Sequence, residues 1–101
     1  DPEKWYKNEY TVPTAKKKYR TGNYKVTKAT VLNVRKGAGT KYAKKTFSQL
    51  TKDAQSKILR LSGEKCNGYV KGLTFTAYEV KNNWGRTPSG WVCLDYCEVV
   101  R

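Results

Sequence analysis

The sequence predicts a mainly β fold, a small β-barrel into which one α-helix is inserted at about residues 46–60. Short segments rich in β-branched and aromatic residues follow one another at close spacing from residue 24 onward, with turn residues between them. One segment instead has its apolar residues at helical spacing. At 101 residues, the chain has the length of a single domain.

Residues 1–22 are predicted to be a linker or tail, and residues 23–101 the folded domain. The first segment contains Pro2, Pro13 and three consecutive lysines at 16–18, and its apolar residues follow no period. Because the chain contains no methionine, we expect it to be a processed or excised piece of a longer protein.

Two strands are predicted next, at residues 24–27 and 30–35, where β-branched residues alternate with polar ones. The glycine-rich segment that follows, residues 36–40, is predicted to be a loop. Its glycines indicate a turn that needs a positive φ more than a phosphate site, because the pattern lacks the Gly-Lys-Ser/Thr that completes a phosphate loop.

The helix is predicted from a change of period. A cap is expected at Thr46 or Ser48, and the end is expected at Ser62 and Gly63. The apolar residues that would form one helical face, packed on the sheet, are Phe47, Leu50, Ala54, Ile58 and Leu61.

The last third of the chain predicts a run of short strands. Residues 72–81 alternate apolar and polar side chains and form the clearest strand. Residues 84–87 and 91–93 then flank a Pro-Ser-Gly turn and predict a hairpin. A single helical turn at 94–96 and a closing strand at 97–100 complete the predicted order.

The charge balance favours an anionic partner. The chain has 21 Lys and Arg against 8 Asp and Glu, a formal net charge of +13, which suits nucleic acid, acidic lipid or a phosphate-rich polymer such as teichoic acid. Most of the basic residues are lysines, which favour diffuse attraction over bidentate recognition. No apolar run is long enough to span a membrane, so we expect no membrane-crossing segment.

The residues that would support catalysis or metal binding are sparse. The chain has no histidine, and its three cysteines supply one ligand fewer than a structural zinc site needs. Glu79 and Asp95 are the carboxylates that could approach each other across the hairpin, but surface or structural roles are the better interpretation. We therefore expect no enzyme activity, metal or cofactor. Free thiols are favoured over one bridge from Cys66 to Cys93 or Cys97.

Several motifs, in order, resemble bacterial SH3 (SH3b) domains. Residues 32–40 (LNVRKGAGT) are similar to the LNVRxGxGT signature of that family, and residues 72–77 (GLTFTA) to its following strand. Residues 84–86 (WGR) and 89–92 (SGWV) resemble its closing hairpin, and residues 95–96 (DY) stand in the usual place after it. One departure is an insertion of roughly 20 residues that contains the predicted helix. The variant looks most like the C-terminal modules of clostridial phage endolysins and autolysins.

The resemblance implies an SH3-like barrel and a non-catalytic module that binds the peptidoglycan of the cell wall. Such modules hold a glycosidase, amidase or endopeptidase on its substrate, so residues 1–22 would be the linker from a missing N-terminal catalytic domain. The protein would act at the bacterial cell wall, after secretion or after release from the host cytoplasm at lysis.

The resemblance also implies a binding groove beside the glycine-rich loop, suited to a stem or cross-bridge peptide of peptidoglycan. Lysines around it would add a salt-sensitive attraction to teichoic acid. The residues predicted to bind the ligand are Asn33, Arg35, Thr40 and Tyr42 from the loop, with Trp84 and Tyr96 facing them.

Two other functions compete with wall binding. The alternative is a nucleic-acid-binding small β-barrel, because positive charge and exposed aromatic rings are also typical of single-strand binders. Binding of proline-rich peptides is disfavoured, because residues 35–45 hold five basic residues and no acidic one, where an acidic specificity loop would be needed.

Overall fold

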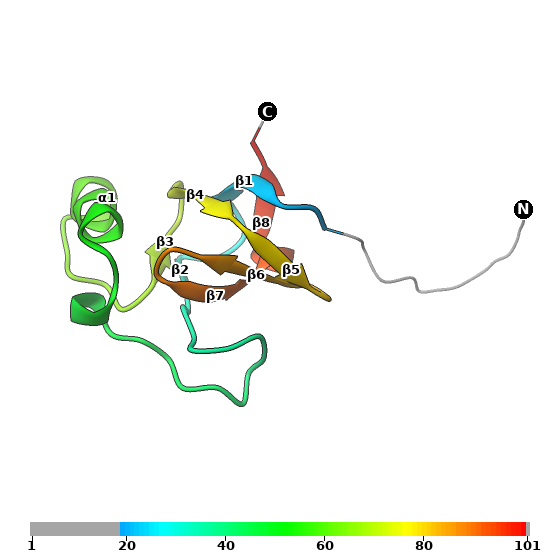
Figure 1. Cartoon of the computed structure of the whole chain (residues 1–101). Coiled ribbons are helices and arrows are strands. Elements are labelled where there is room, and N and C mark those ends of the chain that lie inside the picture. Colours follow the sequence, from blue (N-terminus) through cyan, green and yellow to red (C-terminus); the bar gives the residue numbers. More distant parts are fainter. Residues whose placement is uncertain (1–18, 101) are drawn as a thin grey trace, which may run out of the picture.

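The computed structural model describes residues 19–100, which form three small β-sheets and one α-helix (Figure 1). The predicted mainly β fold with an inserted helix is confirmed, although the sheets do not close into a continuous barrel. The elements are β1 (Gly22–Val26), β2 (Val31–Leu32), the 3-10 helix η2 (Phe47–Gln49), α1 (Lys52–Ser62), β3 (Tyr69–Val70), β4 (Thr74–Ala77), β5 (Glu79–Lys81), β6 (Trp84–Thr87), β7 (Gly90–Cys93), the 3-10 helix η3 (Leu94–Tyr96) and β8 (Cys97–Val99).

β1 is the central strand of the first sheet, whose order is β4-β1-β8. It pairs with both neighbours in antiparallel fashion, and alternate residues, Tyr24 and Val26, are buried in the core. The predicted single strand at 72–81 is divided at Tyr78 into β4 and β5, which belong to different sheets. The division has a tertiary cause, because β4 pairs with β1 whereas β5 pairs with β6.

The predicted hairpin is confirmed as β6 and β7, which pair in register from Trp84↔Cys93 to Thr87↔Gly90. The Thr87 hydroxyl closes the turn by donating to the Gly90 carbonyl at 2.8 Å. The predicted helical turn and closing strand are also present, as η3 and β8.

The predicted strand at 30–35 is shorter than expected. β2 ends at Leu32 and pairs with β3, after which Arg35 forms isolated bridges to Lys44 and Trp91. The chain therefore changes partners between Leu32 and Arg35, and a change of partner is what divides the run of β-branched residues.

The predicted helix at 46–60 begins later, at Lys52, and this boundary was wrong. Thr51 is the N-cap of α1, and its hydroxyl accepts from the Ala54 N–H at 3.2 Å. Thr46 instead caps η2, and the chain is extended at Leu50, with ψ of 164°. The predicted end is confirmed, because α1 stops at Ser62 and Gly63 adopts the left-handed conformation with φ of 75°.

The core lies between the sheets and the inner side of α1. Ile58 is fully buried and Ala54 nearly so, and both come from the helix. Three rings lie in contact across the core: Tyr24 stacks on Phe75 at 6.0 Å between centroids, and Tyr69 meets Phe75 in a tilted arrangement at 5.2 Å. The buried Tyr69 hydroxyl is paired with the Thr87 hydroxyl at 2.7 Å, so its burial leaves no polar atom unpaired.

Tyr19, the first residue that the structure describes, contacts Asp95 on η3, which lies 76 residues further along the chain. The Tyr19 hydroxyl donates to Asp95 at 2.5 Å, and its ring meets Tyr24 edge-on at 6.4 Å. Burial and the Asp95 carboxylate raise the pKa of Tyr19 well above its usual value. Residues 1–18 of the predicted linker at 1–22 lie outside the described residues. Of the remainder, Tyr19 packs on the folded domain and Gly22 begins β1, so these residues belong to the domain and not to a linker.

Candidate functional site

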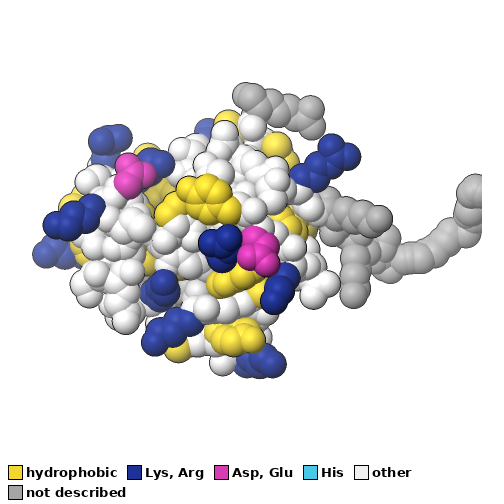
Figure 2. Space-filling view, in the orientation of Figure 1, with side chains coloured by type: hydrophobic (Ala, Val, Ile, Leu, Met, Phe, Trp, Pro, Cys, Tyr) yellow, Lys and Arg dark blue, Asp and Glu magenta, His cyan; other side chains and the backbone are white. Residues whose placement is uncertain are grey.

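β5, β6 and β7 present one side to solvent, and a continuous row of paired residues crosses it. Glu79 pairs with Arg86, Arg86 with Trp91, Trp91 with Arg35, and Arg35 with Lys44. Directly paired residues point to the same side of a sheet. We call this side the outer face (Figure 2 shows its mixed basic and apolar surface), and its residues are Arg35, Lys44, Glu79, Lys81, Trp84, Arg86, Trp91 and Cys93.

Cations lie over aromatic rings on the outer face and beside it. Lys81 Nζ is 5.9 Å from the centre of a Trp91 ring, and the Arg86 guanidinium is 6.0 Å from that of Tyr78. Arg86 also donates to Glu79 at 3.0 Å, which fixes its guanidinium over Tyr78. Half-buried indole and exposed phenol rings are thereby held in place next to positive charge, an arrangement suited to anionic or sugar ligands.

Arg35 holds the glycine-rich loop together. Its Nη1 donates to the carbonyls of Thr40 at 3.1 Å and Tyr42 at 2.9 Å, inside the loop that its own backbone begins. Its N–H and C=O both bond to Trp91 at 2.8 Å. The predicted ligand-binding arginine therefore positions the loop against β7, and part of its donor capacity is used for that.

Two glycines of this loop serve different needs. The predicted positive φ is found at Gly39, with a value of 158°. Gly37 is buried beneath Tyr42, and a Cβ at this position would lie 2.6 Å from the tyrosine ring. Gly37 therefore leaves room for the Tyr42 ring to lie directly on the backbone, and a side chain there would displace this exposed ring.

The six predicted ligand-binding residues are brought together only in part. Arg35, Thr40 and Tyr42 share one loop, whereas Trp84 lies on β6, with β7 between it and Arg35. Asn33 is half-buried and precedes the bridge between Arg35 and Trp91 by two residues. Tyr96 is exposed on η3, outside the outer face.

Sequence reasoning missed Trp91, Arg86 and Lys81 as a group. The signal that could have found them is the register of the hairpin, because alternation about its turn places Arg86 opposite Trp91 on one side.

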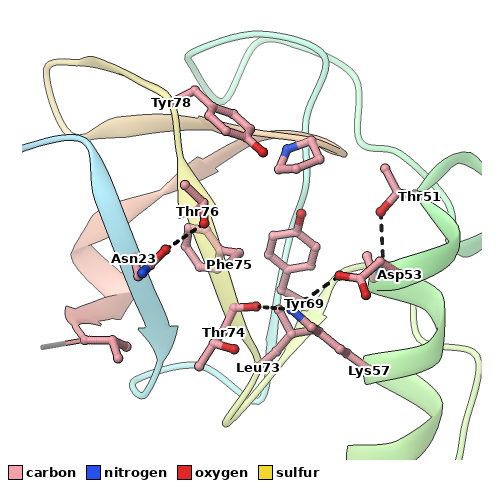
Figure 3. A pocket seen from close by; sticks show the side chains of 13 residues that line it. Asn23, Thr51, Asp53, Lys57, Tyr69, Leu73, Thr74, Phe75, Thr76 and Tyr78 are labelled. Atoms are coloured by element: carbon pink, nitrogen blue, oxygen red, sulfur yellow. Dashed lines mark hydrogen bonds and ion pairs between the residues drawn. The ribbon is translucent and has the colours of Figure 1, made fainter.

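A pocket of about 390 Å³ lies between β4 and the first turns of α1, and Figure 3 shows it from close by. Lys57 on the helix donates to the Thr74 carbonyl at 3.1 Å and forms an ion pair with Asp53 at 3.3 Å. None of the six predicted ligand-binding residues lines this pocket. Its lining residues are Asn23, Thr51, Asp53, Ala54, Lys57, Tyr69, Leu73, Thr74, Phe75, Thr76, Tyr78, Pro88 and Val100.

The two carboxylates considered for catalysis, Glu79 and Asp95, form hydrogen bonds to different partners. Glu79 is paired with Arg86, while Asp95 accepts from Asn83 at 2.6 Å and from Tyr19. Within residues 19–100, no three His, Cys, Asp or Glu side chains are grouped to hold a metal ion. No helix in that same range is long and apolar enough to cross a membrane.

The three cysteines are free, and Cys97 is buried, as predicted. Burial, followed by the neighbouring Cys93, raises the pKa of the Cys97 thiol to about 12. Burial also raises the pKa of Cys93, whose sulfur lies 3.5 Å from the Asn83 amide nitrogen. Cys66, in contrast, lies half-buried after the end of α1.

We expect iodoacetamide at neutral pH to modify Cys66 first and Cys97 last. The thiolate is the reactive form, and a raised pKa together with burial keeps Cys97 protonated and shielded. Peptide mapping by mass spectrometry at successive times measures the order. In urea the three thiols should react at similar rates, and equally fast labelling of Cys66 and Cys97 in the native protein would contradict the described packing of β8.

A scan against models of protein families, a search of the curated proteins and a search of the solved structures find no match to this chain.

Proposed function

We propose that this chain is a non-catalytic module that binds the peptidoglycan of a bacterial cell wall and targets an attached hydrolase to it. The observation that carries the proposal is the row of aromatic and cationic side chains on the outer face, next to the loop held by Arg35. The resemblance of residues 32–40 and of the hairpin to SH3b domains supports the same function.

The outer face is chemically suited to a wall polymer. The half-buried rings of Trp84 and Trp91 offer flat apolar surfaces on which a sugar or an extended peptide can lie. Lys81 and Lys44 add positive charge that would attract the phosphates of teichoic acid. Attraction by exposed charge falls with salt, whereas contact with the rings does not, so the two contributions can be separated.

Co-sedimentation with clostridial sacculi tests the proposal, before and after teichoic acid is removed, at low salt and at ~0.5 M salt, where the screening length falls to about 4 Å. We expect binding to survive both treatments. Trp91→Ala should weaken it about tenfold or more, because a central aromatic residue contributes most of the energy of an interface.

Leu61→Ala is the control, because Leu61 is an exposed apolar residue of α1, outside the outer face. It should bind sacculi nearly as well as the wild type, and equal losses from both variants would refute the outer face as the site. Lys65→Ala, on the exposed segment after α1, provides the control for charge alone.

The alternative, nucleic-acid binding, is supported by the same rings and cations, because bases also stack on aromatic platforms beside positive charge. Loss of sacculus binding under both treatments, with retained binding of a single-stranded oligonucleotide that depends on Trp91, would favour it over wall binding.

A further inference from the structure

β4 has one paired edge and one edge that faces the pocket beside α1. It is an outer strand of the β4-β1-β8 sheet, and its residues Thr74, Phe75 and Thr76 line the pocket. An unpaired strand edge presents backbone N–H and C=O groups that bind another strand readily. The groups that β4 presents there can be identified from the register of the sheet.

β1 uses alternate residues to bond its two neighbours, as antiparallel pairing requires. On the side of β4, the Val26 N–H donates to the Leu73 carbonyl at 3.0 Å. On the side of β8, the Asn23 carbonyl accepts from the Val100 N–H at 2.9 Å. Residues 24 and 26 therefore bond to the β4 side, and residues 23 and 25 bond to β8.

The register places Thr76 opposite Asn23 and Thr74 opposite Lys25. Because these β1 residues bond to β8, the main chains of Thr74 and Thr76 point away from β1, toward the pocket. Lys57 bonds the Thr74 carbonyl at 3.1 Å. Within residues 19–100, no partner is found for the N–H groups of Thr74 and Thr76 or for the Thr76 carbonyl.

The β6–β7 hairpin leaves this edge of β4 uncovered, because β6 pairs with β5, after Tyr78, and not with β4. The Tyr78 N–H donates to the Arg86 carbonyl at 2.8 Å, and β5 pairs with β6 from there on. At the other end of β6, Thr87 is buried in the core, where its hydroxyl lies 2.7 Å from the Tyr69 hydroxyl. Pro88 follows on the wall of the pocket and has no N–H to offer β4.

At one end of the uncovered edge, Lys57 forms an ion pair with Asp53, which also lines the pocket. A lysine ammonium has three donors, and two are used by the Thr74 carbonyl and the Asp53 carboxylate. The third can donate to a main-chain carbonyl of an incoming peptide. Figure 3 shows Lys57 and Thr74 at one end of the pocket and Tyr78 at the other.

We propose that the free edge of β4 binds an extended peptide of small residues by strand addition, with one end of the peptide beside Lys57. The unpaired groups of Thr74 and Thr76 would bond its main chain. Small side chains are required because Tyr69, Tyr78 and the helix wall a pocket of about 390 Å³. No residue of the outer face lines this site, and only Tyr78, beneath the Arg86 guanidinium, borders both.

The test uses the whole chain and acetyl-tetraalanine amide, followed by NMR of the backbone amides. We expect shifts at Thr74, Thr76 and Lys57. Two further peptides carry N-methyl groups at alternate residues, in the two possible registers. Since one side of a strand faces β4, one of these peptides should lose at least about fivefold in affinity and the other should bind nearly unchanged.

Two variants of Thr76 separate its main-chain contact from its side chain. Thr76→Pro removes the free N–H without removing a bond to β1, whereas Thr76→Val keeps the N–H and loses only the hydroxyl, which bonds Asn23 at 2.6 Å. Thr76→Pro should bind tetraalanine at least about fivefold more weakly than Thr76→Val.

Two outcomes would overturn the proposal. Equal binding of the two N-methylated peptides would exclude strand addition, and it can be observed in the wild type even where Thr76→Pro does not fold. The absence of amide shifts at millimolar tetraalanine would exclude the site. Neither result bears on binding to sacculi, so failure here and failure of the outer face remain distinguishable.

Discussion

Gly90→Ala should lower the free energy of unfolding by about 3 kcal/mol or more. Gly90 has φ of 149°, which an L side chain rarely adopts, and a Cβ there would lie 2.7 Å from the Arg35 carbonyl oxygen. This oxygen accepts from the Trp91 N–H at 2.8 Å, so it cannot move aside without breaking the bridge between β7 and the loop. Urea denaturation followed by tryptophan fluorescence measures the loss.

Gly22→Ala is the matched control. Gly22 has a similar φ of 143°, but a Cβ there would meet nothing within 4 Å. The difference between the two variants therefore isolates the close approach of β7 to Arg35 from the cost of the backbone conformation. Equal destabilisation would contradict the described contact. Because Arg35 holds the loop, a folded Gly90→Ala protein should also bind sacculi more weakly.

Ile58→Ala is expected to cost about 2–5 kcal/mol of stability, the usual range for emptying a buried aliphatic site. Ile58 is fully buried and anchors α1 on the core, and the surrounding residues cannot fill the space without moving the helix. Urea denaturation measured by circular dichroism gives the change in unfolding free energy.

Leu59→Ala makes the corresponding change one position along the same helix. Leu59 is 41% exposed, so its loss should change stability by only about 0.5 kcal/mol. Similar losses from Ile58→Ala and Leu59→Ala would mean that α1 does not pack on the core through the side described here.

Local signals predicted the elements whose residues interact with near neighbours. The hairpin followed from the Pro-Ser-Gly turn and the alternation on both sides of it, and η3 and β8 followed in order. The start of α1 was misjudged because Phe47 and Leu50 also fit a helical period. Thr51 followed by Asp53 would have been the better signal, a cap with an acidic residue in the first turn.

Features that depend on distant partners could not be predicted from local patterns. The break at Tyr78 arises because β4 and β5 pair with different strands. Arg35 holds its own loop by donating hydrogen bonds to the Thr40 and Tyr42 carbonyls, and these bonds depend on how residues 36–43 fold back toward it. The pocket exists because α1 packs beside an unpaired edge of β4, and no period or motif in the sequence encodes that juxtaposition.

The central position of β1 has a consequence for the order of folding. Its partners lie far along the chain, since Gly22 pairs with Ala77 and Tyr24 with Val99. During synthesis β1 can pair with β4 first, but its other edge stays open until β8 has been made, whereas the β5–β7 sheet forms from neighbouring segments. Non-local pairing of this kind slows folding, so the closing step should be the slow one and should follow the hairpin.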